Sequence, residues 1–184
     1  MSGLHTGFRV APQSTVSIRR MAWNARQAFA IGDGRIDLEQ FLERMIDYGI
    51  IVDVFDSSDA PVGHGVEACW VPESRTLYIR DTVYANACRG GTRAVFTICH
   101  ETGHIILAHK RTINRESPGR QIPVYENSEW QADTFGAEFA MPLPIINRLR
   151  LETPGAIARH FGVSQQAAEV RIEKLVREAT AQKK

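Results

Sequence analysis

The sequence predicts an α+β fold, because helical patterns in its first and last parts enclose a middle region of short strands. Of the 184 residues, 43% are hydrophobic, which suits one well-buried domain rather than two. Apolar residues recur at helical intervals before residue 50 and after residue 90, and β-branched runs separated by turns lie between. We expect one domain over residues 1–144 and a helical segment over 145–184 packed on it.

Two amphipathic helices are predicted first. One spans Ser14 to Phe29 and stops before a turn rich in glycine. The other follows Asp37, whose carboxylate is the expected N-cap, and its apolar stripe ends at Gly49.

Three short strands are predicted next. They are rich in β-branched and apolar residues and are separated by turn residues, and they span Ile50–Phe55, Val66–Val71 and Arg75–Arg80. Because the last two are joined by a tight turn, we expect a small, mostly antiparallel sheet.

The second half of the chain predicts more helices. One opens near Thr92 and runs to about His109, and a polar loop follows over 111–127. Another helix starts at Ser128, for which Gln131 completes a capping box.

The last helices resemble a helix-turn-helix over Ile157 to Ala168, with Gly162 in the turn. Such a unit could contact DNA, and the tail has a local excess of basic residues. We favour the simpler interpretation of a helical hairpin that packs on the rest of the protein.

Composition excludes several classes of protein. Twenty-two basic and 21 acidic residues leave a net charge of +1, so no strong attraction to nucleic acid or anionic membrane is expected. No apolar run is long enough for a membrane helix, and the start lacks the apolar core of a signal peptide. The cysteines Cys69, Cys88 and Cys99 show neither a disulfide framework nor a thiolate metal site. A cytoplasmic protein is therefore expected.

The most informative motif is H-E-x-x-H at His100 to His104, within an apolar stretch. Residues four apart share a helix face, so His100 and His104 can bind one metal ion with Glu101 beside it. The pattern is typical of zinc hydrolases. We therefore expect one Zn²⁺ ion at this helix.

A third protein ligand is expected, because catalytic zinc sites commonly use three and keep one position open. The helix after the polar loop offers Glu129, and Asp133 lies one turn later on the same face. Glu129 can bind the metal, and Asp133 can accept a hydrogen bond from a ligating imidazole. Gly103 and Gly136 would let the two helices approach closely.

Other interpretations stay open at this point. His100 and His104 could be hydrogen-bonded core histidines, and Glu129 could be a carboxylate favoured by a helix N-terminus. His109 is not expected to be a ligand, because the third histidine of the extended motif lies six residues beyond the second. Four side chains are candidate donors to an oxyanion: His109, Tyr125, Tyr84 and Arg111.

These residues resemble the ImmA/IrrE family of bacterial and phage metallo-endopeptidases. Its members carry H-E-x-G-H, then E-x-x-A-N-x-F-A and a Met-Pro. The stretch from His100 to His104 fits the first pattern. The stretch from Glu129 to Pro142 fits the second, except that Asp133 stands where asparagine is common.

The resemblance implies a zincin-like fold, zinc bound by His100, His104 and Glu129, and Glu101 as the catalytic general base. Family members commonly cleave a transcriptional repressor in response to stress. We therefore expect a zinc endopeptidase of narrow specificity that acts on a repressor, with the strand Thr76–Arg80 as the edge that binds substrate. The alternative is a metal-containing regulatory protein that binds a repressor or DNA without cleavage.

Overall fold

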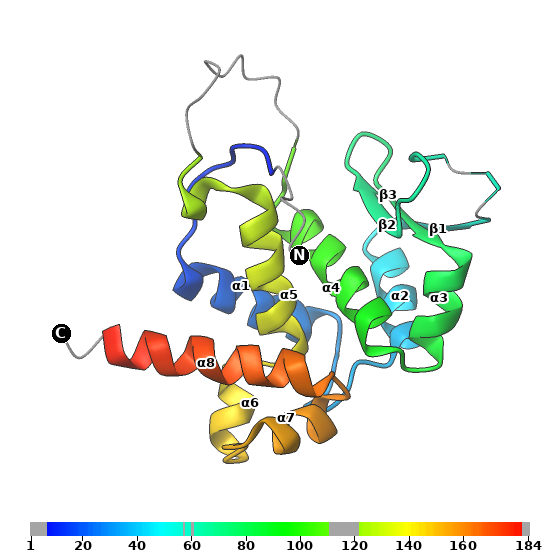
Figure 1. The fold of residues 1–184 in the computed structure, drawn as a ribbon. Helices are drawn as coiled ribbons and strands as arrows, with labels where there is room; N and C mark the ends of the chain where they lie inside the picture. Colours follow the sequence, from blue (N-terminus) through cyan, green and yellow to red (C-terminus); the bar gives the residue numbers. More distant parts are fainter. Residues whose placement is uncertain (1–6, 57, 60, 111–121, 182–184) are drawn as a thin grey trace.

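The computed structural model describes residues 7–56, 58–59, 61–110 and 122–181, and within these ranges the fold is α+β (Figure 1). The elements in chain order are α1 (Thr15–Ala28), α2 (Leu38–Asp47), β1 (Ile51–Phe55), β2 (Ala68–Val71), β3 (Thr76–Arg80), α3 (Asp81–Cys88), α4 (Thr92–Ile106), η1 (Val124–Glu126), α5 (Ser128–Ala140), α6 (Leu143–Arg148), α7 (Pro154–Phe161) and α8 (Gln165–Ala181).

Side chains cap several of the predicted helices, although Gly91, the N-cap of α4, has no side chain to do so. The side chain of Asp37 accepts a hydrogen bond from the main-chain N–H of Gln40 at the start of α2, as the sequence indicates. Thr153 caps α7 in the same way, and Gly162 ends α7 in the left-handed conformation. The α3 and α6 helices were not predicted individually, because each is short and has too few buried positions to produce a clear periodicity.

The sheet is mixed rather than mostly antiparallel, with strand order β1-β3-β2. The β2 and β3 strands form the expected antiparallel hairpin, but β1 pairs with β3 in parallel. The connection from Phe55 to Ala68 carries the chain past β3, so that β3 becomes the central strand. Leu77 and Ile79 of β3 are fully buried.

This topology corrects the expected substrate edge. Thr76–Arg80 is paired on both sides, and a strand with neighbours on both sides has no free edge to offer. The edge strands of the sheet are instead β1 and β2, and β2 contacts α4.

The main contacts between helices are those of α5 with α4 and with α1. At the centre of Figure 1, α4 and α5 lie side by side, and α1 packs against α5. Aromatic rings fill the core between α2 and α5, where the ring centroids of Phe41 and Phe139 are 5.4 Å apart. Within the described residues, none of the helices has both the length and the apolar character that crossing a membrane requires.

The C-terminal helices contact the end of α5. Arg171 of α8 donates hydrogen bonds to the carboxylate of Glu138 and to the carbonyl oxygen of Met141. Because Arg171 is buried, this face of α8 is used for packing.

Candidate metal centre

Two glycines let α4 and α5 approach closely. A Cβ atom on Gly103 would lie 3.0 Å from Cα of Ala132, and one on Gly136 would lie 3.4 Å from the main-chain nitrogen of His100. A Cβ atom 3.0 Å from backbone is rare, so Gly103 lies where a side chain would not fit without a shift, whereas 3.4 Å at Gly136 is close to an ordinary van der Waals contact. The close contact expected from the sequence is confirmed.

Three potential ligands converge between these helices. The ligand atoms of His100, His104 and Glu129 all lie within 4.8 Å of one another. Nε2 of His100 is 3.1 Å from Nε2 of His104. Oxygens of Glu129 lie 3.3 Å from Nε2 of His100 and 3.6 Å from Nε2 of His104. Two imidazoles and a carboxylate so arranged could hold one metal ion.

Asp133 lies behind His100. Its Oδ1 is 2.8 Å from Nδ1 of His100, the ring nitrogen that does not face Glu129. A carboxylate in this position fixes the ring and leaves Nε2 free for a metal. The structure thus brings Asp133 next to the histidine as the E-x-x-x-D spacing predicts.

Glu101 points to the sheet rather than into this group. Its Oε2 accepts a 2.9 Å hydrogen bond from the main-chain N–H of Trp70 on β2. This contact could not be predicted from the sequence, because it depends on the position of β2 beside α4.

The titratable groups have strongly shifted pKa values. Burial raises the pKa of Glu101 to about 7, although the charge of His100 and the Trp70 N–H oppose this. Burial alone would lower the pKa of His100, but hydrogen bonds to Asp133 and Glu129 raise it to about 10. Burial and the neighbouring charge of His100 lower the pKa of His104 to about 4.

The oxyanion candidates occupy different places. His109 is buried, and both of its ring nitrogens have partners, at His104 and Gln131. Tyr125 lies half exposed on η1. Tyr84 lies on α3, where a hydrogen bond with Cys88 raises its pKa. Arg111 lies outside the described residues.

The start of α5 differs from its prediction. The N-cap is Asn127, whose Oδ1 accepts hydrogen bonds from the main-chain N–H groups of Glu129 and Trp130. Ser128 instead accepts a hydrogen bond from the main-chain N–H of Phe8. Gln131 is therefore not part of a capping box and is available for other contacts.

Comparison with known proteins gives the family. The profile of the IrrE N-terminal-like domain, a peptidase family, matches residues 58–173. The chain belongs to this family. A search of curated proteins gave no match.

Solved structures support the same fold for this IrrE-like chain. A Mycobacterium tuberculosis transcriptional regulator is similar, with a TM-score of 0.51 and 18% sequence identity. The alignment covers 83% of this chain and 46% of the regulator, so the chain spans less than half of that protein's length. At this identity the similarity concerns the fold alone.

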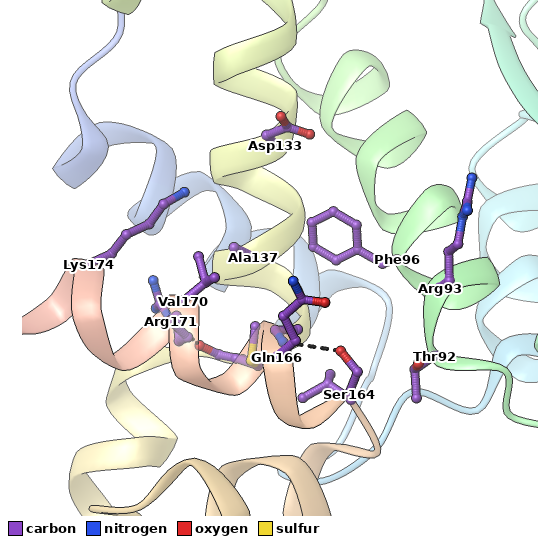
Figure 2. Close-up of a pocket in the computed structure, with 13 residues that line it drawn as sticks. Thr92, Arg93, Phe96, Asp133, Ala137, Ser164, Gln166, Val170, Arg171 and Lys174 are labelled. Atoms are coloured by element: carbon purple, nitrogen blue, oxygen red, sulfur yellow. Dashed lines mark hydrogen bonds between the residues drawn. The ribbon is translucent and has the colours of Figure 1, made fainter. Parts of the chain in front are cut away.

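A pocket of about 590 Å³ adjoins the candidate centre in this IrrE-like domain. Asp133 lies at one end of it, and most of the lining is apolar, from α4, α5 and α8. Figure 2 shows the ring of Phe96 projecting from α4 toward Ala137 of α5. Lys174 and Arg93 lie at opposite sides of the view, so basic groups border the apolar surface.

Proposed function

We propose that this chain is a zinc-dependent endopeptidase of narrow specificity that cleaves a transcriptional repressor in a bacterial or phage regulatory circuit. One observation carries the proposal. His100, His104 and Glu129 converge within 4.8 Å, while Glu101 on the same helix is left outside this group. A purely structural metal site would have no use for a partly buried carboxylate there.

The donor set fits zinc. Imidazole nitrogens and a carboxylate oxygen are common zinc ligands, and three protein ligands leave one position for water or substrate. We assign His100, His104 and Glu129 as these ligands and Asp133 as the residue that orients His100.

Zinc in this place would acidify water and withdraw charge from a peptide carbonyl. Glu101 accepts one proton from the attacking water as its oxygen bonds to the carbonyl carbon. The same carboxyl then gives that proton to the amine nitrogen as the C–N bond breaks. A pKa near 7 suits both roles at neutral pH.

We place the substrate on the β2 edge instead of on β3. Main-chain N–H of Arg80 donates to the carbonyl of Glu67, which fixes the alternation of the antiparallel pair. The N–H of Trp70 therefore points away from β3 and toward α4, as its bond to Glu101 requires. Because the Trp70 N–H is already bonded to Glu101, an extended peptide would pair with the remaining outward-facing main-chain groups of β2 and would lie next to the candidate centre.

The decisive experiment incubates the candidate repressor with the zinc-loaded protein and with Glu101→Gln. We expect cleavage by the wild type only, with about one zinc per chain in both proteins. Glu152→Gln, which removes an exposed carboxylate, is the matched control and should cleave normally. Equal cleavage by the Glu101→Gln variant, or none by the wild type, would contradict the peptidase assignment.

A second experiment tests the ligand set. Glu129→Ala should lose most of its zinc affinity, and unchanged stoichiometry and affinity would refute this ligand. A wild type that binds the repressor without cleaving it would instead favour the regulatory alternative. DNA binding through α7 and α8 has less support, since Arg171 is buried against Glu138.

A further inference from the structure

A chain of hydrogen bonds leads away from His104 on the side opposite the candidate metal position. Nδ1 of His104 is 3.0 Å from Nδ1 of His109, and Nε2 of His109 is 3.0 Å from Oε1 of Gln131. His109 and Gln131 are only 4% and 1% exposed, so water does not replace these contacts. Neither residue has a role in the function proposed above.

The contacts of Gln131 determine which atoms donate and which accept in this series of hydrogen bonds. The amide nitrogen of Gln131 donates to the carbonyl oxygens of Ala11 and Tyr125, at 2.9 and 2.8 Å. Carbonyl oxygens only accept, so the NH₂ group must face them and Oε1 must face His109. Nε2 of His109 is therefore the donor in its bond to Gln131.

The contacts of His104 lead to the same order of donors and acceptors. Nε2 of His104 lies 3.1 Å from Nε2 of His100 and 3.6 Å from Oε1 of Glu129. A neutral imidazole that binds a metal through Nε2 carries its hydrogen on Nδ1. Nδ1 of His104 then donates to Nδ1 of His109. One neutral tautomer of His109, with its hydrogen on Nε2, satisfies both ends.

We infer that His109 and Gln131 are positioning residues that set the tautomer and ring orientation of His104, as Asp133 does for His100. The inference rests on the proposed function in one respect, namely that His104 binds the metal through Nε2. Gln131 is itself held where the N-terminal segment pairs with the residues before α5. There, the main-chain N–H of Gln13 donates to the carbonyl of Tyr125 at 3.0 Å.

The first test is a spectroscopic one on the full chain. Long-range ¹H–¹⁵N spectra of the metal-free and zinc-loaded protein should show hydrogen on Nδ1 of His104 and on Nε2 of His109. A hydrogen on Nδ1 of His109 would overturn the inference. The metal-free spectra do not depend on zinc binding, so a wild type that binds no zinc would refute the proposed function and leave this test intact.

The second test compares zinc affinity by chelator competition. His109→Leu removes the acceptor and should weaken binding by about 10- to 100-fold. His109→Asn keeps an oxygen near the position of Nδ1 and should lose less than about threefold. Gln131→Met removes the acceptor for Nε2 of His109 and should populate both tautomers of that ring.

Controls separate positioning from folding. His160→Leu removes an imidazole that bonds the carbonyl of Asp33 and should leave zinc affinity unchanged. Equal affinity losses in His109→Leu and His109→Asn, or no loss in either, would overturn the inference. If His109→Leu does not fold, the wild-type spectra and the Asn and Met variants still decide the matter.

Discussion

The main-chain N–H of Trp70 donates a 2.9 Å hydrogen bond to Oε2 of Glu101, and this bond joins the edge of the sheet to the motif helix. Burial nevertheless raises the pKa of Glu101 to about 7, so one backbone donor does not compensate for the lost hydration of the charge. The residue proposed to carry protons is therefore held in a setting that disfavours its ionised form. The ionised carboxylate of Glu101 should therefore lower the free energy of unfolding.

Glu101→Gln should be more stable than the wild type at pH 8 when both are free of metal. The folded pKa lies above the ordinary value of 4.5, so the stability of the wild type is full below about 4.5 and falls as the pH rises through 7. The variant avoids this loss and should gain about 1–3 kcal/mol at pH 8 and nothing near pH 4. Urea unfolding at pH 8 and pH 4 measures this difference in stability between the two proteins. Equal stability at pH 8 would contradict the cost assigned to burial of the Glu101 charge.

Zinc affinity should rise with pH. In the metal-free protein, His100 has a pKa of about 10 because Asp133 and Glu129 outweigh its burial. A metal must displace this proton, so affinity should increase by about tenfold per pH unit between pH 7 and 9, with release of one proton. Calorimetry in buffers of different ionisation enthalpy counts the proton. Affinity that is constant over this range would show that His100 is already neutral.

The contact between Asp133 and His100 should contribute to metal binding through its acceptor oxygen rather than its charge. Asp133→Ala removes the 2.8 Å partner of Nδ1 and should weaken zinc binding by about 10- to 100-fold. Asp133→Asn keeps an acceptor and should stay within a few-fold of the wild type. Because the side chain is about half exposed, neither variant should change the unfolding temperature much. If Asn is as damaging as Ala, charge is the important property.

The sequence could predict those parts of the candidate site that depend on helix periodicity. The i, i+4 spacing places His100 and His104 on one face of α4, and the same rule aligns Glu129 with Asp133 on α5. Gly103 also predicts the close contact, because a glycine inside a helix is costly unless it allows packing.

Contacts that depend on pairing between distant segments could not be predicted. The expected edge strand became central because β1 pairs with β3 in parallel, and no local pattern gives the partner of a strand. Gln131 fits a capping box by spacing, yet its amide bonds the carbonyl of Ala11, 120 residues away. The division between residues 144 and 145 stays a prediction.

Gly103→Ala should destabilise the protein and weaken metal binding together. The new Cβ would lie 3.0 Å from Cα of Ala132 and 3.1 Å from its carbonyl oxygen, and backbone cannot move aside as a flexible side chain can. Overpacking of this kind costs about 1–3 kcal/mol, against about 1 kcal/mol gained from helix propensity. Gly136→Ala is the matched control, since its closest contact is 3.4 Å and its propensity gain is the same. Equal stability of the two variants in urea unfolding would mean that the helices can separate without loss.

The buried pair of Glu138 and Arg171 should hold α8 on α5. Arg171 donates to both oxygens of Glu138, and Arg19 donates to one of them from α1. Although burial opposes it, these two arginines keep the pKa of Glu138 below its usual value. The stability from this pair is therefore present above pH 4.5 and is lost as the pH falls through the lowered pKa.

Glu138→Gln should cost about 3–5 kcal/mol at pH 7, because Arg171 is left buried without a counter-charge. Glu173→Gln is the matched control: it breaks an exposed pair with Arg177 and should change stability by less than about 1 kcal/mol. Urea unfolding at pH 7 and pH 3 measures both variants. The Glu138→Gln deficit should shrink at the lower pH, because below about pH 4.5 the unfolded wild type binds a proton that its folded state, with the lowered pKa, binds less readily. The double variant Glu138→Leu with Arg171→Met should recover part of the loss, since no unpaired charge remains at this interface. A deficit that is the same at both pH values would mean that the lost packing, rather than the lost charge, accounts for the effect.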